Sequence, residues 1–115
     1  MKWMMTGEIF DAAEARSGGL VYEVCAPDDL MARAYEMARQ IADNTAPVSS
    51  ALIRQMMYRN SATAHPVEAH KVESLAVFYT SKVDGNEGVA AFLGKRPANF
   101  VSKSSTDMPP FYPWW

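Results

Sequence analysis

The sequence lacks the features that hold secreted and membrane-spanning proteins together. It contains one cysteine, Cys25, so no disulfide can form within the chain, which agrees with a reducing compartment. Its uninterrupted apolar runs are only a few residues long, whereas a helix that crosses a bilayer needs about 20. Residues 1–20 also lack a basic start followed by a continuous apolar region. We therefore expect a cytoplasmic protein that does not enter a membrane.

An excess of charge of either sign is also missing. The 115 residues carry 11 Lys and Arg against 13 Asp and Glu, which gives a formal net charge of −2. Such a chain has no basic field that would favour nucleic acid or an anionic membrane surface. Because 49% of the residues are hydrophobic, there is enough apolar material for a core. We expect at most one globular domain, which recognises its partners by shape.

The usual signatures of chemistry are absent as well. His65 and His70 lie five residues apart, about 140° around a helix, so they cannot face one metal ion together. No glycine-rich nucleotide motif, phosphate-binding loop or nucleophile elbow occurs. Glu14 and Glu87 each follow an aspartate by three residues, which favours helix capping over acid catalysis. We predict no metal ligand and no catalytic residue.

Helical patterns fill most of the chain and predict a mainly α fold. Apolar residues of the first six positions suggest the end of a helix that Gly7 terminates. Residues 20–25 favour a short strand or extended segment, and residues 102–115 an irregular, extended tail with four aromatic side chains in its last five residues. About five helices are expected between these landmarks: 11–16, 28–44, 47–60, 66–83 and 84–96. The break at Pro47 favours an antiparallel hairpin of 28–44 with 47–60.

The stretch 84–100 is the most sharply bounded of these helices. Asp84 and Glu87 have the spacing of a capping box, which predicts that both side chains cap the first turn. An apolar stripe follows, and Pro97 forbids continuation. Lys95 and Arg96 are expected in the last turn, where the helix dipole favours cations. From the residues alone, this basic pair fits a surface pair and a phosphate site equally well.

Several short motifs, taken in order and with their spacings, resemble the C-terminal part of an enoyl-CoA hydratase/isomerase of the crotonase superfamily. They cover nearly all of residues 4–100: Thr6-Gly7, Asp11-Ala12-Ala13-Glu14-Ala15, Gly19-Leu20-Val21, Pro27, Ala46-Pro47, and Asp84-x-x-Glu87-Gly88-Val89-x-Ala91-Phe92-Leu93-x-Lys95-Arg96. Each piece is weak alone. The ordered set is specific to the superfamily and not to one reaction within it.

The resemblance implies a division of labour that accounts for the missing catalytic residues. Family members have an N-terminal spiral of ββα units with the oxyanion hole and the catalytic carboxylates, followed by a helical region used to form trimers. Residues 1–101 resemble that helical region, 102–115 form the tail, and the spiral is expected to be absent. The parent would be a lyase of fatty acid metabolism that hydrates 2-enoyl-CoA thioesters without a cofactor. This chain alone is expected to be inactive.

The resemblance also implies one binding role. Lys95 corresponds to a residue that contacts the phosphates of CoA bound to a neighbouring subunit, with Phe92 as its packing support. Gly94 stands where the family usually has Glu, and Ala76 lies where some relatives offer a Phe to the adenine. Two alternatives remain open: a free-standing helical interaction or oligomerisation module, and the same family with isomerase, hydrolase or dehydratase chemistry.

Overall fold

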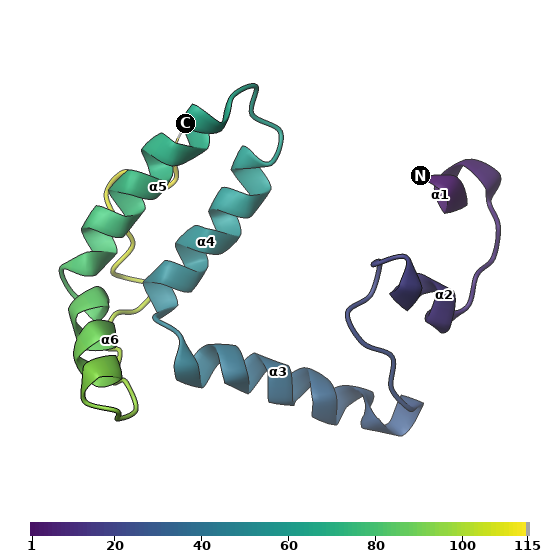
Figure 1. The fold of residues 1–115 in the computed structure, drawn as a ribbon, viewed down its shortest axis with the longest axis horizontal. Coiled ribbons are helices and arrows are strands. Elements are labelled where there is room, and N and C mark those ends of the chain that lie inside the picture. The colour runs from purple at the N-terminus through teal and green to yellow at the C-terminus, as the bar shows by residue number, and fades with distance from the viewer. Residues whose placement is uncertain (115) are drawn as a thin grey trace. The chain divides into compact units, whose positions relative to one another are not determined.

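The computed structural model describes residues 1–114, and these residues form six α-helices, one short 3-10 helix and no strand (Figure 1). The prediction of a mainly α fold is therefore confirmed. The chain divides into two compact units, residues 1–36 and residues 37 onward, which are described separately. The elements are α1 Lys2–Thr6, α2 Ala12–Ser17, the 3-10 helix η1 Pro27–Asp29, α3 Leu30–Asn44, α4 Pro47–Asn60, α5 Pro66–Ser81 and α6 Asp84–Leu93.

The first unit is built around the side chain of Trp3. Helix α1 ends at Gly7, whose φ of 65° is left-handed, as the sequence predicted. Asp11 caps α2 by accepting the backbone N–H of Glu14 at 2.7 Å, also as predicted. The Glu14 side chain does not complete a capping box, because its Oε1 accepts the indole N–H of Trp3 at 2.8 Å. The Trp3 ring stacks on Phe10 with centroids 4.1 Å apart, so one glutamate and one ring hold α1 to α2.

The segment between α2 and η1 is irregular. Residues 20–25 form no strand, so the strand alternative of the prediction is wrong. A strand requires hydrogen bonds to a neighbouring extended segment, and the described part of the chain contains no strand to provide them. Glu23 instead accepts hydrogen bonds from Arg33 Nε and Nη2 at 3.1 and 2.8 Å, which attaches the segment to α3.

The second unit is a helical hairpin with a third helix added. Helices α4 and α5 pack against each other, and α6 packs against α5 (Figure 1). Pro47 and Pro66 begin α4 and α5, as predicted, because proline needs no backbone donor in the first turn. His65 caps α5, since its Nδ1 accepts the N–H of Val67 at 3.1 Å. The expected hairpin of 28–44 with 47–60 is wrong, because α5 is the close partner of α4.

The core of this unit lies between α4, α5 and the C-terminal tail. Its buried members are Val48 and Leu52 of α4, Val72 and Ala76 of α5, and Trp114. The tail is irregular, as predicted, and three of its side chains pack on this core: Met108, Phe111 and Tyr112. Arg59 donates to the backbone carbonyl of Trp114 at 2.6 Å and lies over its ring. The predicted packing role of Trp115 lies outside the described residues.

Helix α3 has an apolar stripe that is not covered. The sequence predicts one buried face, yet no residue of α3 is buried. Leu30, Met37 and Ile41 remain 58%, 40% and 53% exposed. The expectation of a buried face is therefore wrong for this chain, because none of its other segments covers the stripe. Apolar side chains at helical spacing with no cover are typical of a surface that packs on another polypeptide.

Candidate functional site

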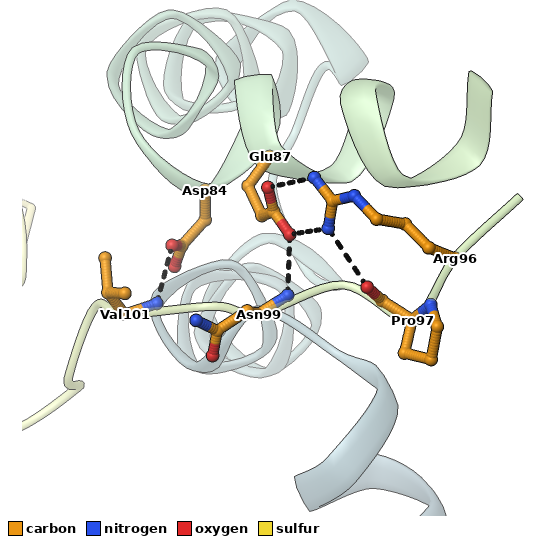
Figure 2. A network of polar contacts seen from close by, with 6 residues as sticks. All are labelled: Asp84, Glu87, Arg96, Pro97, Asn99 and Val101. Carbon is orange, nitrogen blue, oxygen red and sulfur yellow. Dashed lines mark hydrogen bonds and ion pairs between the residues drawn. The ribbon is translucent and has the colours of Figure 1, made fainter. Parts of the chain in front are cut away.

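The candidate site lies at helix α6 and the loop that follows it, where Figure 2 shows two carboxylates reaching from the helix to that loop. Asp84 is only 4% exposed and its Oδ1 accepts the backbone N–H of Val101 at 3.1 Å. Val83 is the N-cap and no side chain caps the helix. The predicted capping box is therefore wrong, because the chain folds back and its own backbone N–H groups occupy these carboxylates.

Glu87 forms the centre of the network in Figure 2. It accepts two hydrogen bonds from the Arg96 guanidinium, at 2.6 and 2.9 Å, and a third from the backbone N–H of Asn99 at 2.7 Å. The Arg96 hydrogen bonds, followed by that of Asn99, lower the pKa of Glu87 to about 2. A carboxylate that stays ionised at neutral pH cannot serve as a general acid, so its role is structural.

Arg96 is fixed by the same contacts and is not available to a ligand. Besides Glu87, it donates to the carbonyl of Pro97 at 3.1 Å. The hydrogen bonds and the charge of Glu87 raise the pKa of Arg96. Of the two basic residues that the sequence singled out, Arg96 therefore anchors the loop. Lys95 is the one whose ammonium group has no hydrogen bond or ion pair to another described residue.

Helix α6 ends in a Schellman motif with an unusual residue at its key position. The N–H of Arg96 donates to the Ala91 carbonyl at 3.1 Å, and the N–H of Lys95 donates to the Phe92 carbonyl at 3.2 Å. Lys95 has a φ of +49°, the left-handed conformation that this motif usually gives to glycine. Lys95 and Arg96 thus follow the helix and do not lie in its last turn, which corrects the prediction.

The end of α2 has the same motif with the expected residue. There the N–H of Leu20 donates to the Ala15 carbonyl at 2.9 Å, and the N–H of Gly19 donates to the Arg16 carbonyl at 3.0 Å. Gly19 has a φ of +75°. A side chain in this conformation costs about 1–2 kcal/mol, so glycine is the residue that favours folding at both positions. Lys95 therefore keeps a charged side chain at a backbone position that disfavours it.

The two predicted site residues share one exposed helix end. Phe92 is 82% exposed, its neighbour Leu93 is 75% exposed, and Lys95 is also on the surface. An aromatic ring and a cation therefore stand beside each other in solvent. Ala76, in contrast, is 5% exposed and belongs to the core, so its side chain cannot reach a ligand.

A cavity of about 310 Å³ lies on the other side of Asp84 from the basic loop's ion pair, between α4, α5, α6 and the tail. Its lining combines apolar and polar side chains: Val48, Tyr79, Thr80, Val83, Asp84, Val101, Ser102 and Asp107. Within residues 1–114, no three His, Cys, Asp or Glu side chains cluster closely enough for a metal ion. None of the described helices has the length and apolar character needed to cross a bilayer.

Sequence reasoning missed this cavity and the network beside it. Glu87 and Arg96 lie nine residues apart, and Asp84 and Val101 lie 17 apart, so no helical spacing relates them. Their contacts arise from the path of the loop after Pro97. The cluster of charged residues on both sides of a proline break was the one available signal.

Comparison with known families decides which protein family has this arrangement. The model of the enoyl-CoA hydratase/isomerase family matches residues 1–103. The chain belongs to this family. Its relatives include the enoyl-CoA hydratase AKT3-2 of Alternaria alternata, which is 40% identical over 98 residues, covering 83% of this chain and 32% of the relative. A probable enoyl-CoA hydratase of Rhizobium meliloti is 36% identical over 108 residues, covering 87% of this chain and 38% of the relative.

Membership of the enoyl-CoA hydratase/isomerase family extends across kingdoms. The mitochondrial enoyl-CoA hydratase of Pongo abelii is 31% identical over 102 residues, which cover 87% of this chain and 34% of that protein. The chain spans about a third of the length of these relatives. The family match ends at residue 103, so Asp107 and Trp114 lie beyond it.

Proposed function

We propose that this chain is the helical C-terminal part of an enoyl-CoA hydratase and that Lys95 contacts the phosphates of CoA, supported by the exposed ring of Phe92. The observation that carries the proposal is Lys95 itself, a lysine kept in a left-handed conformation at an exposed helix end. Unfavourable backbone conformations persist where the side chain has a role. Lysine is a common phosphate ligand because its ammonium group acts as a compact point charge.

The ion pair beside Lys95 supports this assignment. Glu87 and Arg96 satisfy each other and fix the loop, so the local negative charge is already neutralised by Arg96. Lys95 can therefore offer its positive charge to an anion without first breaking a salt bridge. The neighbouring Phe92 provides an apolar surface for the rest of the ligand.

Titration of the labelled chain with CoA tests the Lys95 assignment. We expect CoA to shift the NMR amide signals of residues 92–97, and Lys95→Gln to weaken binding about tenfold, which corresponds to the loss of one charge-assisted contact. Lys103→Gln is the matched control, because it removes the same charge from an exposed position in the tail. Equal effects of the two substitutions, or CoA-induced shifts confined to other residues, would contradict the proposal.

We infer that the chain also provides contacts between subunits. Many large apolar side chains are exposed, and those of α3 and the end of α6 are the clearest: Leu30, Met31, Tyr35, Ile41, Phe92 and Leu93. Such surfaces are typical of an interface between polypeptides. Light scattering should detect a dimer or trimer at micromolar concentration. A monomer that persists at high concentration would contradict this inference.

The reaction of the parent is proposed from the resemblance. The catalytic carboxylates and the oxyanion hole belong to the spiral of the family, and none of the glutamates here is placed for acid catalysis: Glu14 binds Trp3, Glu23 binds Arg33 and Glu87 binds Arg96. We expect the chain by itself to leave crotonyl-CoA unchanged in an absorbance assay. Turnover above the buffer rate would disprove this expectation.

A further inference from the structure

The cavity beside Asp84 contains a buried carboxylate with half of its hydrogen bonds unmade. Oδ1 of Asp84 binds the N–H of Val101, whereas the buried Oδ2 has no partner. The whole residue is 4% exposed. An acceptor removed from water without a hydrogen bond destabilises a fold by about 1–3 kcal/mol, and by more when it is charged. The fold therefore keeps an unmet requirement for a donor at this position.

Asp84 also lies where its negative charge is retained. It is the first residue of α6, a helix of ten residues, and the positive end of the helix dipole stabilises an anion there. Substitution by an apolar residue would remove the unpaired oxygen, yet the sequence places an aspartate against the cavity. This combination is the one expected of a residue that receives a donor from outside the segment.

The other polar groups of the cavity are mostly acceptors. The Thr80 hydroxyl donates to the Ala76 carbonyl at 2.9 Å, so its oxygen can only accept from a ligand. Asp107 accepts the N–H of Lys103 at 2.7 Å through Oδ2 and has further acceptor capacity as a carboxylate. None of the residues that line the cavity in the described part of the chain is basic. The cavity therefore suits a cation with several N–H donors.

The walls distinguish between organic cations and metal ions. Val48, Val83 and Val101 are apolar and Tyr79 is aromatic. A hard metal ion would need about six oxygen ligands, and no metal-binding cluster is present among residues 1–114. A guanidinium group is planar, weakly hydrated and stacks on aromatic rings, whereas an ammonium group is compact and strongly hydrated. A volume of about 310 Å³ is at the lower end of small-molecule sites, which fits one such side chain.

We propose that this cavity binds a guanidinium group, with Asp84 as its principal carboxylate and Asp107 and Thr80 as further acceptors. The site is distinct from the Lys95 site, because it takes a cation and uses none of the same residues. The guanidinium belongs to a free small molecule or to an arginine side chain of another polypeptide. Both sources present the same donors to Asp84.

NMR titration with arginine methyl ester tests this site, because the amide of Val101 reports directly on Asp84. We expect saturable shifts at Val101, Ser102 and Thr80 with a dissociation constant of about 1 mM, as suits one small cation. Citrulline methyl ester is the neutral control and should leave these signals unchanged. Equal shifts with both compounds, or none with arginine methyl ester, would overturn the proposal.

Two variants and one control keep the test independent of folding. Asp84→Asn retains an oxygen for the Val101 N–H but loses the charge, and should weaken binding about tenfold. Asp107→Asn, at an exposed position, should weaken it by a smaller factor. Asp43→Asn makes the same charge change on the surface of α3 and should have no effect. Wild-type affinity in both cavity variants, or equal loss in the control, would refute the site.

The source of the guanidinium follows from light scattering in the presence of arginine methyl ester. Dissociation of an assembly by the ester, but not by the citrulline compound, identifies an arginine of another chain. An assembly that persists while the NMR shifts at Val101 saturate identifies a small-molecule ligand. Failure of these shifts would leave the CoA titration at residues 92–97 unaffected, so the two proposals are separable.

Discussion

Arg96 and Glu87 face each other across the end of α6 and are joined by two N–H···O hydrogen bonds of 2.6 and 2.9 Å. The pair is accessible to solvent, with 47% and 24% of the two side chains exposed. Its main effect is therefore geometric. It holds the loop after the helix, and with it the backbone of Asn99, against the first turns of α6.

This ion pair predicts a specific dependence of stability on pH. Because folding lowers the pKa of Glu87 from 4.5 to about 2, its stabilising effect is fully present above pH 4.5. The effect is lost as the pH falls from about 4.5 to about 2 and Glu87 becomes protonated in the folded state. Urea unfolding of the wild type and Glu87→Gln should show a difference at pH 6 that vanishes near pH 2. A difference that is constant with pH would contradict the role of this carboxylate.

The left-handed conformation of Lys95 predicts that the natural residue is not the most stable one. Lys95→Gly should raise the free energy of unfolding by up to about 1 kcal/mol, because glycine adopts positive φ without a steric cost. The same change should weaken CoA binding. Gly19→Ala is the matched test at the end of α2 and should destabilise the fold by about 1 kcal/mol. A loss of stability in Lys95→Gly would show that the side chain stabilises the fold.

The tail predicts a large effect of one aromatic residue. Trp114 is 3% exposed in the core of α4 and α5, so Trp114→Ala should lower the free energy of unfolding by about 3–5 kcal/mol. Phe92→Ala, at an 82% exposed ring, should change it by less than about 0.5 kcal/mol. Urea denaturation followed by circular dichroism measures both. Similar stabilities of the two variants would contradict the packing of the tail.

The first unit offers a steric test at Gly18. A Cβ atom at this position would lie 2.4 Å from the Trp3 ring, closer than any real contact. Gly18→Ala should therefore displace Trp3 and break its hydrogen bond to Glu14, which the indole N–H signal of Trp3 in an NMR spectrum would report. Ser17→Ala, on the exposed side of α2, serves as the control. An unchanged Trp3 signal in Gly18→Ala would contradict the contact.

Local signals in the sequence were sufficient for the starts of helices and for several of their ends. Pro47, Pro66, Gly7 and the cap at Asp11 act within one turn of the chain, so their effects can be read from neighbouring residues. The same reasoning failed at Asp84 and Glu87. Their spacing is that of a capping box, but backbone N–H groups from Asn99 and Val101 compete for the carboxylates.

Contacts between distant segments set the remaining limits. Periodicity identified the apolar stripe of α3 but not what covers it, because the pattern is the same whether the partner is this chain or another. The hairpin partner of α4 was missed for a similar reason. The candidate site divides in the same way: the sequence placed Lys95 and Phe92 on one helix end, whereas the cavity at Asp84 depends on the path of the tail.

The packing of Trp114 has a consequence for where this protein can be cut. The family match stops at residue 103, and a shortened version designed from that match would end there. Such a version would lose the ring that fills the space between α4 and α5, together with one wall of the cavity. The length of sequence that homology recognises is thus shorter than the length that folding needs. In this branch of the family, residues 104–114 are under selection as internal parts of the protein, and their drift should be as slow as that of a core helix.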